Sequence, residues 1–272
     1  MVNNFRVAIC QMLIGDDKDT NLSVAAEMIK KSTDLGAQMV VLPEVFNSPY
    51  QASLFPAYAE ICPGKTIDFM SRTAARYGIY LVGGSIIEKE ENRLFNSSFI
   101  YGPSGDLLGR HRKMHLFDVQ IENGITFRES DTLSPGSDVT VIKSGSLCFG
   151  VMICFDIRFP ELARRCVLDG AQMLVVPAAF NTVTGPAHWE VLMRARAIDN
   201  QCYVLAASPA RNPGSTYQAW GHSMVVDPWG RIKAEAGIGQ EIVMTDIDWG
   251  LIKQIRSEMP LLQQRRPELY RI

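Results

Sequence analysis

The sequence predicts an α/β protein in which buried strands alternate with amphipathic helices. Short apolar runs rich in β-branched residues recur along the chain, and stretches with apolar residues near helical spacing lie between several of them. Glycine follows three of the expected helices, where a left-handed residue commonly ends a helix. A chain of 272 residues is compatible with one large core and does not require two domains.

The apolar runs predict strands at residues 6–10, 39–42, 79–82, 151–153, 173–176 and 203–206. Helices are expected between them at residues 21–35, 66–77, 158–169 and 188–200. Two hairpins are expected, with turns through Gly-Pro-Ser-Gly at 102–105 and through Asp-Pro-Trp-Gly at 227–230. Because hairpins add antiparallel pairs to the parallel pairs of an α/β protein, the sheet should be mixed.

The charge distribution favours a small-molecule partner. The formal net charge is −2, and no basic run is longer than pairs such as Arg164-Arg165, so the footprint of a nucleic-acid-binding protein is missing. No apolar run approaches the roughly 18 residues that span a bilayer, and the first residues lack the pattern of a signal peptide. We therefore expect no nucleic acid or membrane partner and a cytoplasmic location.

The cysteines and histidines predict neither disulfides nor a metal site. There is no Cys-x-x-Cys pair, and a chain of this size does not need disulfides, so reduced thiols are expected. The histidines at 111, 115, 188 and 222 do not have the spacing of a zinc motif. Gly-Ile-Gly at 237–239 lacks the third glycine and the following helix of a nucleotide-binding loop, so no cofactor is expected.

Glu44 directly follows an apolar run and a proline. Pro43 ends the expected strand because it offers no N–H to the ladder, and this places Glu44 at the strand's carboxyl end. In open α/β sheets, ligands and catalytic groups collect at these ends. The alternative is that Glu44 is a solvated acid in a loop.

Cys154 stands where the apolar run 149–153 passes into a helix-like stretch. Backbone N–H groups at the start of a helix favour a thiolate and can hold a developing oxyanion, which suits a nucleophile in acyl transfer. The alternative is a small buried core cysteine.

Lys113 lies in a basic cluster that follows an expected strand. In a desolvated pocket a lysine can act as an acid, a base or an electrostatic clamp. The alternative is a charged surface loop.

Together these segments resemble the nitrilase superfamily, whose members carry Glu, Lys and Cys in this order at strand ends. The matching segments are Val-Leu-Pro-Glu at 41–44, Arg-Lys-Met-His-Leu-Phe at 112–117 and Cys-Phe-Asp-Ile-Arg-Phe-Pro-Glu at 154–161. Further similarity at 185–190, 194–201, 221–223, 227–230 and 265–270 extends the resemblance over nearly the whole chain. One departure is Phe155, where relatives often have tyrosine, so any contact through a phenolic hydroxyl is lost.

The resemblance implies an αββα sandwich, with two mixed sheets packed between layers of helices. It also implies a single carbon–nitrogen hydrolase domain over residues 1–272, with a C-terminal arm at about 258–272 that is compatible with a homodimer or higher homo-oligomer.

For the site, the resemblance implies that Cys154 attacks a carbonyl carbon, Glu44 moves the protons, and Lys113 holds the oxyanion with the backbone N–H of Phe155. Glu129 resembles the second acid of the family, which would orient Lys113 or the substrate. The alternative for Glu129 is an exposed acid in a loop.

Segments 46–50, 126–136, 179–181 and 207–211 resemble the ω-amidase branch. This branch implies hydrolysis of the terminal amide of 2-oxo acid amides, such as 2-oxoglutaramate and 2-oxosuccinamate, through a cysteine thioester. The rivals are an amidase acting on deaminated glutathione, a hydrolase acting on an N-carbamoyl amine or a nitrile, and a non-catalytic binding protein of the same fold.

Arg158 and Tyr50 are candidates for binding the substrate. Arg158 would lie one helical turn after Cys154 and could pair with a substrate carboxylate, whereas the alternative is a structural salt bridge to Asp156 or Glu161. Tyr50 would donate a hydrogen bond to the substrate. His188 suggests a Cys–His pair, but it stands at an expected helix start, where capping or packing accounts for it, and it is left out of the catalytic set.

Overall fold

The computed structural model describes residues 5–122 and 124–270. Residues 1–4, on which the expectation about a signal peptide partly rests, lie outside the described residues, as do the last two residues of the expected C-terminal arm. No described helix is long and apolar enough to cross a membrane.

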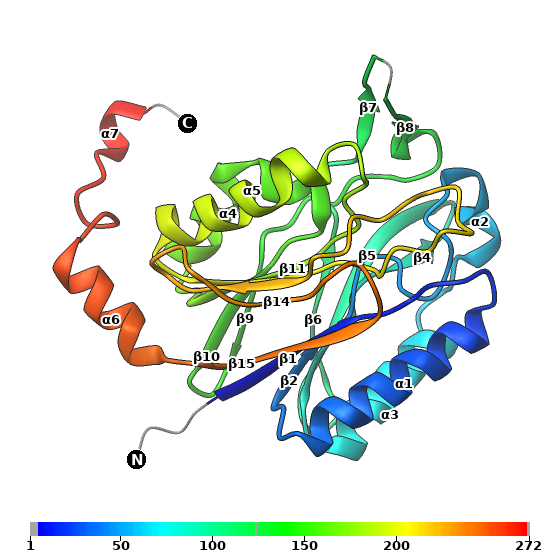
Figure 1. The fold of residues 1–272 in the computed structure, drawn as a ribbon, viewed down its shortest axis with the longest axis horizontal. Helices are drawn as coiled ribbons and strands as arrows, with labels where there is room; N and C mark the ends of the chain where they lie inside the picture. Colours follow the sequence, from blue (N-terminus) through cyan, green and yellow to red (C-terminus); the bar gives the residue numbers. More distant parts are fainter. Residues whose placement is uncertain (1–4, 123, 271–272) are drawn as a thin grey trace.

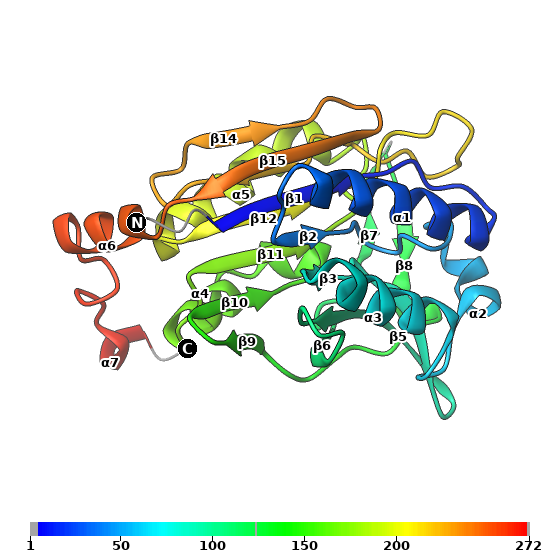
Figure 2. The same cartoon turned by 90° about the horizontal axis from the view of Figure 1, so that it is seen from below.

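Two mixed β-sheets pack face to face (Figures 1 and 2). The seven-stranded sheet has the order β15-β1-β2-β3-β5-β4, and β6 pairs with β5. Its strands are β1 (Phe5–Gln11), β2 (Met39–Val41), β3 (Tyr80–Val82), β4 (Ile86–Glu90), β5 (Arg93–Tyr101), β6 (Leu107–Arg112) and β15 (Glu241–Ile247). The six-stranded sheet has the order β14-β13-β12-β11-β10-β9. Its strands are β9 (Thr140–Ser144), β10 (Leu147–Val151), β11 (Met173–Pro177), β12 (Tyr203–Ala207), β13 (Met224–Val226) and β14 (Ile232–Glu235).

Helices cover the outer face of each sheet. α1 (Lys18–Asp34) and α3 (Lys65–Tyr77) lie on the seven-stranded sheet, and α4 (Pro160–Leu168) and α5 (Gly185–Asn200) lie on the six-stranded sheet (Figure 2). Two smaller elements lie outside these layers. One is a short helix, α2 (Phe55–Tyr58), and the other is a hairpin of β7 (Asp118–Gln120) and β8 (Thr126–Arg128). α6 (Trp249–Glu258) and α7 (Pro267–Tyr270) lie at one end of the molecule, beside the two helix layers (Figure 1).

The alternation of side chains along β1 explains why two sheets and two helix layers form. Val7 and Ile9 point to the apolar core between the sheets, whereas Ala8 and Cys10 point to the core beneath α1 and α3. The six-stranded sheet follows the same pattern, with Val151 facing the other sheet and Leu174 facing α4 and α5. The central strands of both sheets are therefore covered on both faces.

The predicted αββα sandwich with two mixed sheets is confirmed, and most predicted elements lie within two or three residues of their predicted positions. Both hairpins pair in antiparallel register as predicted. The β7–β8 hairpin was not anticipated.

The segment around Cys154 differs from the prediction. A strand was predicted at residues 151–153, but β10 lies earlier and ends at Val151. A helix was predicted at residues 158–169, and the observed helix α4 begins at Pro160. Between them, Cys154–Arg158 forms a short 3₁₀ helix. Proline suits the first position of a helix and disfavours helical backbone in the residue before it, which explains why α4 starts at Pro160.

Gly84 gives a test of how the fold supports the end of β2. It has a φ of 55°, and a Cβ atom there would collide with the carbonyl oxygen of Pro43, directly before Glu44. We expect Gly84→Ala to lower the free energy of unfolding by roughly 2–4 kcal/mol. Alanine is strained in this left-handed backbone conformation, and its Cβ atom would also overpack the space next to Pro43. Urea unfolding measures this change.

Gly78→Ala is the matched control. Gly78 also has a positive φ, of 62°, but a Cβ atom there meets open space, so only the backbone strain of about 1 kcal/mol is expected. Equal losses in the two variants would contradict the close packing behind Glu44.

Candidate active site

The ends of three strands bring Glu44, Lys113 and Cys154 into one buried site. Glu44 follows β2 and Lys113 follows β6 in the seven-stranded sheet, whereas Cys154 follows β10 in the six-stranded sheet. All three side chains are buried, and the backbone N–H of Glu44 donates to Ala178 O, just beyond β11, at 3.4 Å. The site therefore lies where the two sheets meet.

Glu44 is held by donors on one oxygen only. Its Oε1 accepts hydrogen bonds from Lys113 Nζ at 2.8 Å and from Asn96 Nδ2 at 2.8 Å. Its Oε2 has no hydrogen-bond partner among the described residues. This arrangement fixes the carboxylate and leaves one oxygen available to a reacting group.

Lys113 lies between two buried carboxylates. Its Nζ is 2.8 Å from Glu44 Oε1 and 3.0 and 2.9 Å from the two oxygens of Glu129. Glu129 also accepts from the backbone N–H of Phe117 at 2.7 Å and from the Tyr50 hydroxyl at 2.8 Å. The exposed-loop alternatives for Glu44, Lys113 and Glu129 are therefore wrong.

This charge cluster shifts the pKa values of its members. Burial alone would lower the pKa of Lys113, but the charges of Glu129 and Glu44 raise it well above its usual value. Burial raises the pKa of Glu44, and the charge of Glu129 adds to this effect, while Lys113 opposes it. Lys113 is therefore an ammonium, and Glu44 is a stronger base than an exposed glutamate.

Cys154 begins the 3₁₀ helix in a left-handed conformation, with a φ of 47°. This backbone region is unfavourable for a residue other than glycine, and such strain often accompanies functional side chains. Burial raises the pKa of its thiol well above the usual value, and the charge of Glu44 raises it further. Lys113 and the backbone N–H of Ala179 lower it but do not compensate. These effects together favour the neutral thiol over the thiolate.

Arg158 lines, together with Cys154, a small cavity that has a free volume of about 10 Å³. Its guanidinium lies 4.8 Å from the ring centroid of Phe180, and its Nη1 is 3.2 Å from His188 Nδ1. Among the described residues it forms no salt bridge, so the structural pairing with Asp156 or Glu161 is not found. Its Nε is buried without a hydrogen-bond partner in the described chain. The cavity thus places an unpaired positive charge next to the thiol.

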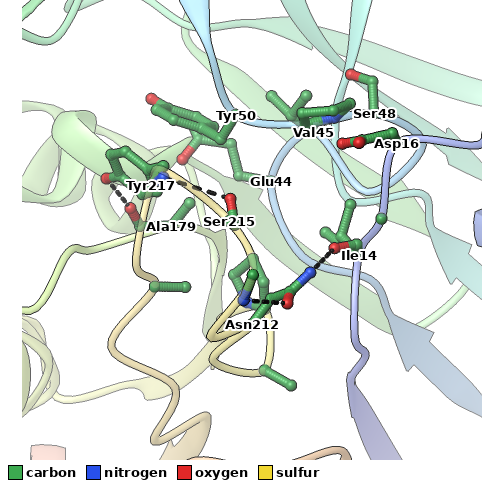
Figure 3. Close-up of a pocket in the computed structure, with 16 residues that line it drawn as sticks. Ile14, Asp16, Glu44, Val45, Ser48, Tyr50, Ala179, Asn212, Ser215 and Tyr217 are labelled. Atoms are coloured by element: carbon green, nitrogen blue, oxygen red, sulfur yellow. Dashed lines mark hydrogen bonds between the residues drawn. The ribbon is translucent and has the colours of Figure 1, made fainter.

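A second, larger pocket of about 160 Å³ opens beside Glu44 and Tyr50 (Figure 3). Its far wall is formed by the loop that carries Asn212 and Tyr217, and Asn212 Nδ2 donates to Ile14 O at 2.9 Å. Figure 3 shows Tyr217 next to Glu44 and Tyr50, with its hydroxyl directed at the carbonyl oxygen of Ala179. Because Tyr217 and Ala179 line both cavities, they lie between the pocket and the thiol.

Several residues of the site were not predicted from the sequence: Asn96, Tyr217, Ala179 and Asn181. Asn96 lies in the interior of β5, where a buried polar residue within an apolar strand was a usable signal. Asn181 lines the cavity beside Cys154, and its Nδ2 is buried without a partner among the described residues. His188 contacts Arg158, and the described residues contain no hydrogen bond between His188 and Cys154. In the described ranges, no group of His, Cys, Asp and Glu side chains is arranged to hold a metal ion.

Comparisons with known proteins identify relatives of this chain. A family model described as carbon-nitrogen hydrolase matches residues 6–257. Omega-amidase NIT2 of Xenopus tropicalis is 48% identical over 268 residues, covering 98% of this chain and 97% of that protein. Omega-amidase NIT2 of Homo sapiens is 46% identical over 271 residues, covering 100% and 98%. The crystal structure of Saccharomyces cerevisiae Nit3, a member of branch 10 of the nitrilase superfamily, superimposes with a TM-score of 0.89 at 44% identity, covering 97% of each chain.

Lys113→Met tests the charge balance of the cluster. It removes the ammonium and leaves Glu44 and Glu129 buried without their cation, so the free energy of unfolding should fall by roughly 3–5 kcal/mol. Adding Glu129→Gln should recover part of this loss, because one uncompensated charge is removed. Urea unfolding of both variants provides the measurement.

Lys253→Met is the control, because Lys253 is an exposed residue of α6 and should change stability by less than about 0.5 kcal/mol. A loss of less than about 1 kcal/mol in Lys113→Met would mean that Lys113 does not compensate the two buried carboxylates.

Proposed function

Because the chain belongs to the carbon-nitrogen hydrolase family, within the nitrilase superfamily, we propose that it is an ω-amidase that works through Cys154, Glu44 and Lys113. The observation that carries this proposal is the unpaired guanidinium of Arg158 in the same cavity as the Cys154 thiol. The relatives named omega-amidase, at 46–48% identity over nearly the whole chain, support the same activity. The substrates are 2-oxo acid amides such as 2-oxoglutaramate and 2-oxosuccinamate, which carry a carboxylate at one end and a primary amide at the other.

The first step is attack of the Cys154 sulfur on the amide carbon. Because the thiol is neutral at rest, its proton must leave during the attack, and Glu44 is the base whose charge already acts on the thiol. The protonated Glu44 then donates to the nitrogen of the departing ammonia. This leaves an acyl group on Cys154 as a thioester.

Lys113 and the backbone N–H of Phe155 stabilise the negative charge that develops on the carbonyl oxygen. Phe155 is the second residue of the 3₁₀ helix, and N–H groups in a first helical turn have no partner within the helix. Lys113 is fixed by two carboxylates, so it does not need to reorient when the charge appears. The Phe155 side chain is not required for this role.

Water completes the reaction by attacking the thioester. Glu44, which is a carboxylate again after protonating the ammonia, accepts a proton from this water. The C–S bond then breaks, Glu44 returns the proton to the Cys154 sulfur, and the dicarboxylate is released. The large pocket beside Glu44 supplies a route for the water and for the ammonia.

Glu129 and Tyr50 orient Lys113: the Tyr50 hydroxyl donates to Glu129 and lies 3.4 Å from Lys113 Nζ. Tyr50 also lines the pocket beside Glu44, so the substrate contact expected from the sequence remains part of the proposal.

Arg158 selects the substrate by pairing with its carboxylate. The small cavity contains the donors Arg158 and Asn181 and no acidic side chain, so an anionic group is favoured there. The positive charge of Arg158 also disfavours the 2-ammonium group of glutamine or asparagine. Amides of 2-oxo acids satisfy both conditions.

The same proposal covers location and assembly. Residues 1–272 would form one carbon–nitrogen hydrolase domain, and the arm at 258–272 would cross to a second copy in a homodimer. Support comes from the exposed apolar side chains of the arm, Met259, Leu269 and Tyr270, and from the family match, which ends at residue 257. All six cysteines are unpaired, which fits a reducing, cytoplasmic location.

Cys154→Ala should abolish ammonia release from 2-oxoglutaramate while the protein stays folded, because it removes the nucleophile. Cys154→Ser should be almost as inactive, and Glu44→Gln should lower kcat on the order of 10²-fold or more. Cys62→Ser is the matched control, because Cys62 is exposed and outside the site. Full activity of Cys154→Ala would rule out the covalent mechanism.

Arg158→Lys should lower kcat/KM for 2-oxoglutaramate by about ten- to a hundredfold, because lysine cannot form the forked contact, worth about 1.5–3 kcal/mol. For a simple amide without a carboxylate the same change should have little effect. Arg194→Lys on the exposed face of α5 is the control.

The substrate panel should include glutamine, asparagine, N-carbamoyl amines, nitriles and deaminated glutathione, with ammonia and the released dicarboxylate measured for each. If deaminated glutathione or a carbamoyl compound gives the higher kcat/KM, the family assignment stands and the ω-amidase proposal does not.

A further inference from the structure

Asp156 is a buried carboxylate that the reaction steps above do not use. Its side chain is fully buried between the segment that carries Lys113 and the turn that carries Cys154. Burial alone would raise its pKa, but hydrogen bonds from His111 and His115 hold the pKa well below its usual value. The group therefore stays ionised throughout the neutral pH range.

One oxygen of Asp156 holds the residues directly after Lys113. Oδ1 accepts from the backbone N–H of Met114 at 3.2 Å, from the backbone N–H of His115 at 2.9 Å, and contacts His115 Nδ1 at 2.8 Å. The imidazole of His115 also stacks on Phe159, with ring centroids 3.6 Å apart, at the end of the Cys154 turn. These contacts fix the backbone from which the Lys113 side chain extends.

The other oxygen holds the peptide directly before the nucleophile. Oδ2 accepts from the backbone N–H of Ile153 at 2.9 Å and contacts His111 Nε2 at 3.0 Å. His111 lies in β6, two residues before Lys113, and its Nδ1 is 3.0 Å from Thr140 Oγ1 in β9. One carboxylate thus joins strands of both sheets on either side of the reacting groups.

We propose that Asp156 is a positioning residue that sets the place of Cys154 relative to Lys113. It touches no reacting atom and acts through the two backbone segments that it joins. The need for such a residue follows from the fold, because Glu44 and Lys113 belong to one sheet and Cys154 to the other. Any sliding of one sheet on the other would separate the thiol from its base and from the ammonium.

The left-handed backbone of Cys154 makes this contact more important. A φ of 47° is unfavourable and persists only where the surroundings hold it. The hydrogen bond from Ile153 N–H to Asp156 closes the near side of the turn. On the far side, Arg196 Nε of α5 donates to Ile157 O at 2.9 Å. The turn is therefore held from both ends, and of these two hydrogen-bonded anchors Asp156 is the one that also binds the lysine segment.

Asp156→Asn is the direct test, and it rests on the proposed amidase activity. The amide nitrogen of asparagine must face at least one N–H donor that Asp156 accepted, so one segment has to move. We expect kcat to fall about 10²-fold while KM changes little, because a displacement of about 1 Å at reacting groups costs this much. The labelling of Cys154 by iodoacetamide should slow relative to the labelling of exposed Cys62 in the same molecule.

Glu88→Gln is the matched control for the loss of a buried carboxylate. Glu88 is as buried as Asp156 and accepts from Ser97 Oγ at 2.6 Å and from Arg112 Nε at 2.9 Å, but it does not join the two sheets. This variant should lose stability and keep kcat and the labelling ratio.

If Asp156→Asn does not fold, His115→Ala serves in its place. This change removes the contact between the partly exposed His115 side chain and Asp156 Oδ1. We expect kcat to fall several-fold, which is the effect expected from the loss of a single hydrogen bond. A folded Asp156→Asn, or a folded His115→Ala, with unchanged kcat and labelling ratio overturns the positioning role. A wild-type protein that releases no ammonia from any amide and has no reactive Cys154 would instead refute the proposed function.

Discussion

The site depends on one buried ammonium shared by two buried carboxylates. Lys113 Nζ lies within 3.0 Å of oxygens from both Glu44 and Glu129, and all three side chains are inaccessible to solvent. Buried charges are tolerated only where partners and hydrogen bonds compensate them, and here the extra donors are Asn96, Tyr50 and the Phe117 N–H. These contacts fix the ammonium and the two carboxylates relative to one another. That arrangement leaves Glu44 Oε2 without a hydrogen-bond partner among the described residues, and the charge of the carboxylate acts on the Cys154 thiol.

The packing of the two sheets brings Cys154, which follows a strand of the six-stranded sheet, to this cluster at the end of the seven-stranded sheet. β2 and β6 end on one side of the interface and β10 ends on the other, so residues that lie far apart in the sequence meet there. The turns that follow β2 and β10 each contain a residue with a left-handed backbone. Val45, next to Glu44, has a φ of 49°, and Cys154 has a φ of 47°. A β-branched residue rarely adopts this conformation, so the packing around it must hold it in place. In this account the apolar core fixes the two chain reversals, and the reversals aim the functional side chains.

The sequence predicted much of this arrangement, because strand ends can be recognised locally. Proline after the run 39–42 marked the end of β2, and apolar periodicity marked β1, β11 and β12 within a residue or two. The turn at Cys154 could not be derived in the same way, because its 3₁₀ helix is held by Asp156, whose partners lie about 40 residues earlier in the chain. Arg158 was predicted near the pocket for a geometric reason that is wrong, since no α-helix connects it to Cys154, yet it reaches the same cavity. Tyr217 comes from a long loop with no periodic signal, and only the folded chain brings it beside Glu44.

In the proposed reaction, an acyl group from a 2-oxo acid amide is transferred to Cys154. Rapid mixing of the wild-type protein with 2-oxoglutaramate, acid quenching and mass spectrometry of the intact and digested chain test it directly. The proposed mechanism predicts a transient mass increase equal to the acyl group, located on the peptide that contains Cys154, together with an equal amount of ammonia released early. Steady ammonia release with no adduct on any peptide, or an adduct on a residue other than Cys154, would contradict it.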